Sequence, residues 1–250
     1  QSAGDLILVT NGNGAATVVN NAGIDFGTSN VGGALNVTAS AGTITQNGGA
    51  LTVAGTSAFT TSTNDQAITL SSTSNALGGT VAFTTAGTAG NVVIDNGTTG
   101  LDLAASTING TLTATGGASA GIVDSGNVAV AGNVTLTTDA GNGVINMGTL
   151  QQSTGDLILV TNGNGAATVV NNAGIDFGTS NVGGALSATA SSGNITQNGG
   201  ALTVAGTSSF ILGANSANVV LDHASNAFSG AVTLLAGEGG SQAFGNVTFV

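Results

Sequence analysis

The stretch GDLILVTNGNGAATVVNNAGIDFGTSNVGGAL occupies residues 4–35 and occurs again, unchanged, at residues 155–186. It belongs to a longer duplication in which Gln1–Phe59 reappears as Gln152–Phe210, offset by 151 positions and with six substitutions. Self-similarity at a fixed offset is typical of an array whose units bury their apolar faces against their neighbours. We therefore expect one continuous segment over residues 1–250, with 1–151 and 152–250 (partial) as copies of a 151-residue higher-order repeat.

The composition favours a packed β structure with a nearly uncharged surface. The chain has 43 Gly, 41% hydrophobic residues and only 4% charged residues, and it lacks Lys, Arg, Pro, Cys, Trp and Tyr. Ordinary globular domains carry about 25% charged residues, so Thr, Ser, Asn and Gly must supply most of this surface. Disorder is disfavoured because Val, Ile, Leu and Thr fill short alternating runs throughout the chain.

The formal charge of −11 restricts the partners of the chain. Nucleic acid is not expected as a partner and anionic membrane surfaces are disfavoured, because binding them requires Lys or Arg. The absence of cysteine excludes disulfides, thiolate metal sites and thiol catalysis. Membrane insertion is not expected, since no apolar run approaches the roughly 18–20 residues of a spanning helix.

Short strands joined by Gly and Asn corners account for the local pattern. Apolar residues alternate with polar ones around Leu35 and Val81, while LILV at 6–9 and 157–160 is apolar throughout, as in a strand covered on both faces. AsnGly and GlyGly pairs recur between these runs, and they predict tight corners with positive φ. Helix signals are poor, because Gly and β-branched residues are too frequent.

These strands predict an all-β fold, a parallel β-solenoid (β-helix) with roughly 22 residues per coil. A recurring phrase places a Gly two residues before a Val or Leu that starts a strand, and several of its spacings are near multiples of 22–23; the anchors are Leu35, Val81, Leu112, Val134, Leu186 and Val232. A sandwich or barrel is the alternative, but the uninterrupted long repeat and the coil spacing favour the solenoid. Its interior would hold four phenylalanines at matching positions of the two copies: Phe26, Phe59, Phe177 and Phe210.

The repeated phrases resemble those of a known group of proteins. SerAsnValGlyGlyAlaLeu (180–186), GlyAsnIleThrGlnAsnGlyGlyAlaLeuThrValAlaGlyThr (193–207) and SerAsnAlaPheSerGlyAlaValThrLeu (225–234) are similar to repeats of filamentous-haemagglutinin-like adhesins and autotransporter passenger domains. The resemblance covers essentially the whole chain. It implies a right-handed β-helix, export to the bacterial cell surface and a role in adhesion or matrix.

Few residues are candidates for catalysis or metal binding. The single histidine, His223, has only Asp222 nearby as an acid, which does not support Ser–His–Asp catalysis and favours an exposed turn residue. Asp25, Asp95 and Asp176 are weak Ca²⁺ candidates at Asp- and Asn-rich corners, although neither an EF-hand nor a GlyGlyXGlyXAsp repeat is present. Turn aspartates bonded to their own backbone are the simpler interpretation. We expect no cofactor and no catalytic residue.

The sequence therefore predicts a non-enzymatic structural or adhesive segment of an extracellular bacterial fibre, surface adhesin or biofilm matrix. Its partners would be further copies of itself, stacked end to end, and cell-surface or matrix glycans. The alternative is a carbohydrate-binding or carbohydrate-active β-helix, although polysaccharide-cleaving sites usually need a basic residue and this chain has no Lys or Arg. An ice-binding face is disfavoured, because the ThrXThr runs at 43–45 and 111–113 are irregularly spaced.

Overall fold

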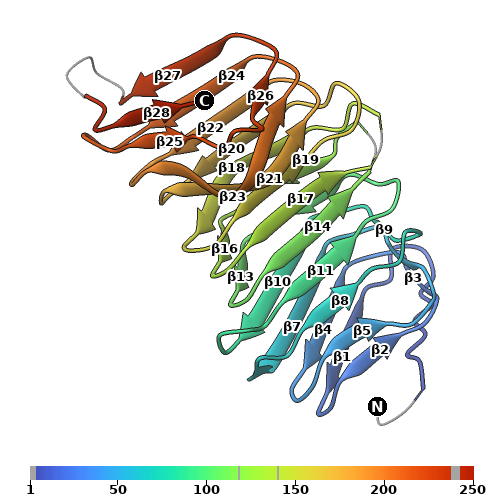
Figure 1. Ribbon diagram of the computed structural model, residues 1–250. Coiled ribbons are helices and arrows are strands. Elements are labelled where there is room, and N and C mark those ends of the chain that lie inside the picture. The colour runs from blue at the N-terminus through green and yellow to red at the C-terminus, as the bar shows by residue number, and fades with distance from the viewer. Residues whose placement is uncertain (1–3, 118, 140, 238–242) are drawn as a thin grey trace.

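The chain folds as a parallel β-solenoid (Figure 1). The computed structural model describes residues 4–117, 119–139, 141–237 and 243–250. Within these ranges there is no helix, every strand pair is parallel, and strands from successive coils form three sheets. Two sheets run the length of the molecule and the third is confined to its N-terminal part. The predicted fold class is confirmed.

The sheets are built from the following strands. The 13-stranded sheet contains β1 (Ala16–Asn20), β4 (Leu35–Ala39), β7 (Ser57–Asn64), β10 (Val81–Ala86), β12 (Leu101–Leu103), β13 (Ser106–Ile108), β15 (Ile122–Asp124), β16 (Val128–Val130), β18 (Ile145–Gln152), β20 (Ala167–Asn171), β22 (Leu186–Ala190), β24 (Ser208–Leu212) and β27 (Val232–Ala236). The 12-stranded sheet contains β2 (Ile24–Phe26), β5 (Ile44–Gln46), β8 (Ile68–Leu70), β11 (Val92–Asp95), β14 (Leu112–Gly116), β17 (Val134–Thr138), β19 (Leu157–Val160), β21 (Ile175–Val182), β23 (Ile195–Val204), β25 (Val219–Leu221), β26 (Ala227–Phe228) and β28 (Val247–Phe249). The three-stranded sheet contains β3 (Ser29–Val31), β6 (Leu51–Val53) and β9 (Ala76–Leu77).

The coil length varies within a repeated pattern. In the 13-stranded sheet Ala16 pairs with Leu35, Leu35 with Ser57, and Ser57 with Val81. The number of residues between paired positions increases at each step, so each of these coils is longer than the one before it. The same three lengths recur in the same order from Ala167 to Val232. Between these runs the sheet continues through β10, β12, β15, β18 and β20, so seven strand-to-strand steps separate β1 from β20. The 151-residue offset thus corresponds to seven coils of, on average, the predicted length.

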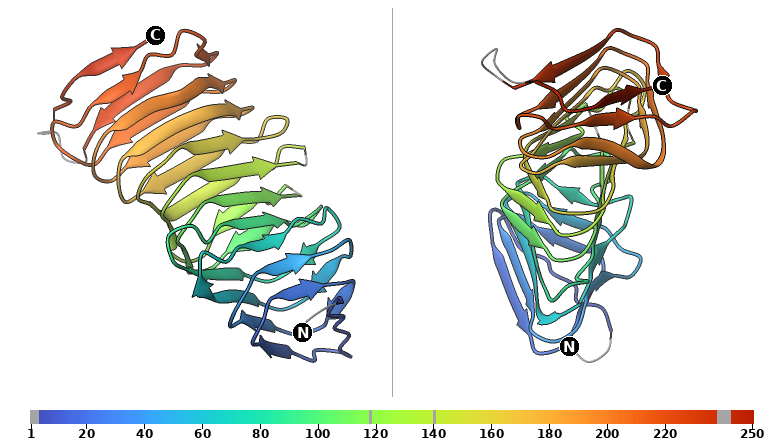
Figure 2. Two further views of the ribbon diagram at one scale, coloured as in Figure 1. Left: turned by 60° about the horizontal axis from the view of Figure 1, so that its bottom comes forward. Right: turned by 60° about the vertical axis from the view of Figure 1, so that its left-hand side comes forward.

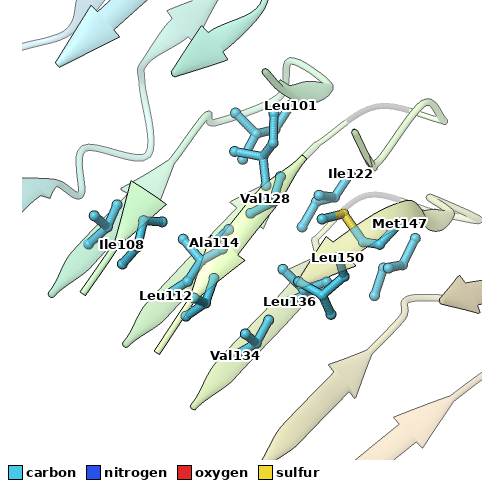
Figure 3. Packing of buried hydrophobic residues seen from close by; sticks show 14 of the residues in the cluster. Leu101, Ile108, Leu112, Ala114, Ile122, Val128, Val134, Leu136, Met147 and Leu150 are labelled. Carbon is cyan, nitrogen blue, oxygen red and sulfur yellow. The ribbon is translucent and has the colours of Figure 1, made fainter. Parts of the chain in front are cut away.

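The core is a column of side chains enclosed by the coils. In the strands between the two ends of the stack, alternate residues point inward and are buried, as in β17, where Val134 and Leu136 lie inside (Figure 3). The predicted phenylalanines are all buried, and Phe26 packs edge-on against Phe59 with ring centroids 6.4 Å apart. In the second copy Phe177 and Phe210 are similarly placed, at 6.1 Å. Like residues therefore occupy like positions along the column.

The anchor residues of the recurring phrase lie in two different sheets. Leu35 and Val81 belong to the 13-stranded sheet, as do Leu186 and Val232, whereas Leu112 and Val134 belong to the 12-stranded sheet. The phrase therefore does not mark one fixed point of successive coils. The irregular spacings arise where the phrase moves from one side of the solenoid to another.

The glycines serve two physical purposes, of which the sequence indicated one. Gly12 and Gly97, each following an Asn, have a φ of 55°, as predicted for tight corners. Gly32 does not have positive φ; instead a Cβ there would overlap the carbonyl oxygen of Gly12 in the preceding coil. Close approach between coils therefore requires this glycine, because a side chain at Gly32 would collide with the corner below it.

The LILV strands are covered on one face only. In β19 the leucines Leu157 and Leu159 are buried, but Ile158 and Val160 point outward and are half-buried. The prediction of a strand covered on both faces is therefore wrong. Its outward face carries apolar side chains without a second layer above them.

The two termini lie at opposite ends of the stack of coils (Figure 2). The coils succeed one another along a single axis, so the ends of the stack are the faces where the column of core side chains stops. The β1 strand pairs only with β4 among the described strands, and β27 pairs only with β24.

Two groups of buried serines differ in their hydrogen bonding. Ser29, Ser106 and Ser180 each accept a hydrogen bond of 3.0 Å from a backbone N–H of the preceding coil. Ser57 and Ser208, which occupy equivalent positions at the starts of β7 and β24, are buried with no hydrogen-bond partner for the hydroxyl in the described structure. The first group replaces missing ladder bonds, whereas the second leaves a polar atom unsatisfied.

The same substitution in the two groups is expected to have opposite effects. Ser106→Ala leaves the buried N–H of Phe83 without its acceptor and should destabilise the protein by about 1–3 kcal/mol. Ser57→Ala removes a desolvated hydroxyl and should stabilise the protein by about 1 kcal/mol. Denaturant unfolding of the two variants measures both shifts, and shifts in the same direction would contradict the assignment.

Candidate functional site

His223 lies in an exposed turn. Its Nδ1 accepts a hydrogen bond of 3.2 Å from the N–H of Ser225, and its carbonyl accepts one from Asn226. In the first copy Ser72 has the same role, because its hydroxyl accepts from the N–H of Ser74. The expectation of an exposed turn histidine is confirmed, and the side chain completes a turn that a serine completes elsewhere.

The three Ca²⁺ candidates lie at separate places. Asp25 in β2 accepts a hydrogen bond of 2.9 Å from the Thr45 hydroxyl of the next coil, and Asp176 in β21 accepts the same bond from Thr196. Asp95, at the end of β11, accepts from the N–H of Gly97 at 2.8 Å. In the described ranges, no three His, Cys, Asp or Glu side chains lie close enough to hold a metal ion together. Ca²⁺ binding at these residues stays a prediction.

Asn and Gln side chains make a repeated buried contact at one corner. The amides of Asn75 and Gln46 bond reciprocally, with nitrogen–oxygen distances of 2.6 and 3.0 Å, and Asn75 also accepts from the N–H of Leu51. In the second copy Asn226 and Gln197 form the same pair at 2.7 and 2.9 Å. These amides satisfy backbone groups where the chain turns away from the ladder, so we assign them to the scaffold.

An uncharged groove crosses the middle coils and is the strongest candidate for a binding site. It has a volume of about 540 Å³ and extends over five successive coils. Its lining is uncharged: Thr107, Ile108, Asn109, Ala129, Val130, Ala131, Gln151, Ser153, Asn172, Ala173 and Ser192. A second hollow of about 240 Å³ shares Ser153 with it and includes the carboxylate-bearing Asp176.

The groove lies where the cross-section of the solenoid changes. On its N-terminal side it is lined by β13, β16 and the end of β18, which pair with one another in register. On its C-terminal side the groove is lined by residues of two corners, 172–174 and 191–194, which connect the two long sheets. Strand therefore gives way to corner along the groove. The sequence did not reveal this site, because none of its residues belongs to a recognisable motif.

In the described part of the chain, no helix has the length and apolar character needed to cross a membrane.

Comparison with protein families assigns the chain to one of them. The family described as "Repeats of unknown function (DUF5649)" matches residues 3–84, 89–160 and 164–235. These segments cover most of the chain, which therefore belongs to this family. Searches of curated proteins and of solved structures gave no match.

The family unit is half of the 151-residue repeat. The matched segments end at Thr84, Val160 and Leu235, so two successive units together span the offset between the two copies. Thr84 and Leu235 lie in the 13-stranded sheet, whereas Val160 lies in the 12-stranded sheet. Successive units therefore place equivalent strands on alternate sides of the solenoid. Sequence reasoning missed this unit, because the repeated contacts that reveal it, such as those of the three bonded serines, are seen only in the structure.

Threonines at the corners show the same period. The hydroxyls of Thr10, Thr85 and Thr161, which are separated by one family unit each, donate to a carbonyl four or five positions ahead. Each also accepts from a backbone N–H of the next coil, at 2.9 or 3.0 Å. The corner chemistry is thus copied with the unit, whichever side of the solenoid it occupies.

Asp65 closes an exposed corner that also recurs in each unit. It has a positive φ of 62°, like Asn142 and Ser216 at the equivalent corners. Its carboxylate accepts hydrogen bonds from the N–H groups of Thr88 and Ala89, at 2.7 and 2.8 Å, and these bonds lower its pKa below the ordinary 3.8. Burial has the opposite effect at Asp95 and raises its pKa above 3.8.

The chemical shifts of the amide protons bonded to these two carboxylates should change with midpoints on opposite sides of pH 3.8. Because its pKa is depressed in the folded state, Asp65 contributes stability above its unfolded pKa, and that stability is lost as pH falls through the folded value. NMR should therefore show the Thr88 and Ala89 amides titrating below pH 3.8 and the Gly97 amide titrating above it.

Asp65→Asn supplies the control. An Asn at the equivalent corner, Asn142, accepts from the N–H of Asn164 at 2.8 Å, so the variant should keep the corner and lose only the titration at Thr88 and Ala89. Equal midpoints for the amides at Asp65 and Asp95 would contradict the assignment.

Proposed function

We propose that this chain is a structural and adhesive segment of an extracellular bacterial fibre or surface adhesin. Its coils stack along one axis, and each end can accept a further coil, either of a longer chain or of another copy. The segment acts without catalysis, through its length and its repetitive polar surface. The resemblance of its phrases to filamentous-haemagglutinin-like and autotransporter repeats supports the location at the cell surface or in a biofilm matrix, and membership of a repeat family is consistent with it.

The observation that carries the proposal is that one sequence is buried to different extents at its two positions in the chain. Leu157 and Leu159, inside the second copy, are completely buried. Leu6 and Leu8, in the same sequence at the N-terminal end, are only half-buried. The identical residues differ because the coil beneath β19 has no counterpart beneath residues 6–9 in the described structure. The N-terminal face is thus a core surface suited to a further coil.

The opposite end presents the complementary surface. Val232 and Leu234 of β27 are only half-buried, whereas their equivalents Val81 and Phe83 in β10 are completely buried. Both ends also present strand edges without a partner strand in the described part of the chain. Since all strands are parallel, the C-terminal edge of one molecule matches the N-terminal edge of another in direction.

The sequence contains neither of the two residue types that most often prevent such pairing. Exposed strand edges are commonly blocked by Lys, Pro or a covering element, and this chain contains neither Lys nor Pro. Instead Val19, an apolar side chain on the edge strand β1, is 68% exposed. End-to-end stacking would pair this edge and cover the core residues beside it.

Val19→Pro should block this assembly without weakening the molecule itself. The N–H of Ala16 bonds to Ala34 and the carbonyl of Asn20 bonds to Ser40, so alternation directs the N–H of Val19 away from β4, towards the free edge. Sedimentation velocity should show concentration-dependent association of the wild-type chain into end-to-end multiples. The association should be lost in Val19→Pro, because proline removes that donor.

Val19→Thr is the matched control, since it keeps the N–H and the β-branched shape and should associate like the wild type. Electron microscopy of the same samples should show rods whose lengths are multiples of one molecule. A wild-type chain that stays monomeric at high concentration would overturn the proposed axial contact.

A further inference from the structure

We propose that the uncharged groove over the middle coils binds a neutral oligosaccharide that lies along the solenoid axis. This site deepens the adhesive part of the proposed function by naming the chemistry of its ligand. It rests on the groove alone and does not require end-to-end assembly. Four features of the groove support this ligand: the shape of its floor, its free hydrogen-bonding groups, its lack of charge and the spacing of its coils.

The floor of the groove consists of outward side chains stacked in register. Thr107, Ala129 and Gln151 lie opposite one another in β13, β16 and β18, one residue per coil. The neighbouring residues Val128 and Leu150 point inward and belong to the core (Figure 3). The backbone beneath the groove is therefore held by the ladder on both sides and presents a firm, repeating surface.

Several polar groups along this surface have no partner within the described protein. The side chains of Thr107, Gln151 and Asn172 form no hydrogen bond there, whereas Asn109 and Ser153 donate to carbonyls of the preceding coil. Gln151 and Asn172 each offer two donors and an acceptor, which suits the mixed donor and acceptor character of sugar hydroxyls. Two free amides and a free hydroxyl thus face the same groove.

The charge of the site selects a neutral ligand. No charged residue lines the larger hollow, and the chain as a whole has a formal charge of −11. Anionic chains are repelled, and there is no Lys or Arg to bind them. Ala129, Ala131 and Ala173 keep the floor low, so a flexible hydroxyl-rich chain can approach the backbone closely.

The spacing of the coils fits a polymer of sugars. Successive coils lie about 4.8 Å apart, which is close to the length of one pyranose unit in an extended chain. Each sugar would therefore meet one coil, with its hydroxyls against the residues of that level. A peptide ligand is less suited, because the groove offers stacked side chains and no free strand edge.

The groove occurs where a middle unit meets the second copy, and this supplies a matched control. Asn21 and Asn172 are equivalent under the 151-residue offset and occupy equivalent exposed corners, but only Asn172 lines the groove. A substitution at Asn21 changes the same corner without touching the site.

The test uses NMR titration of the 250-residue chain with neutral linear hexasaccharides, namely cellohexaose, mannohexaose and chitohexaose. Hexagalacturonate serves as the anionic comparison. At least one neutral hexasaccharide should shift the side-chain amide signals of Gln151 and Asn172. The double variant Gln151→Ala/Asn172→Ala should weaken this binding at least tenfold, and Asn21→Ala should leave it unchanged.

Four outcomes would overturn the site: no shift with any neutral probe, equal weakening by Asn21→Ala, equal binding of hexagalacturonate, or amide shifts that follow protein concentration and not added sugar. The last result would assign the groove to a second copy of the chain. Because Val19→Pro removes assembly without altering the groove, titrating that variant separates failure of this site from failure of the fibre proposal.

Discussion

The backbone ladder between successive coils is the constraint on which the rest of the structure depends. Each strand N–H and carbonyl must find a partner one coil above or below, so strands must stay parallel and in register. The corners are free to differ in length, and coils of three different lengths therefore stack without disturbing the ladder. This freedom explains why the sequence repeats strand patterns more faithfully than it repeats spacings.

Side chains of Ser, Thr, Asn and Gln complete the ladder at the points where it fails. At a corner the backbone turns away from its neighbour, and its polar groups would be buried without partners. The hydroxyls of Ser29, Thr10 and their equivalents supply those partners one coil away. A chain with 4% charged residues can hence be both well packed and polar. Its short polar side chains act mainly on its own backbone.

The sequence was sufficient for the fold but not for the placement of its units. Alternation around Val134 and the 151-residue offset predicted strands, a solenoid and the mean coil length, because these depend on local periodicity and repetition. The sheet to which Leu112 belongs could not be predicted, since it depends on the summed lengths of all preceding corners. The role of Gly32 was missed for a related reason: the carbonyl that excludes a side chain there belongs to Gly12, one coil away.

The candidate site also results from how the units are placed around the solenoid, and its residues belong to no sequence motif. The family unit is half of a seven-coil repeat and so does not make a whole number of coils, which means that each unit begins on a different side from the one before. Where two units meet, the end of β18 stands beside the corner 172–174, and the surface there is hollowed. Gln151 and Asn172 come from different units and face one groove only because of this mismatch. A search for catalytic residues along the chain could not find such a site, since the unit that is copied contains only half of it.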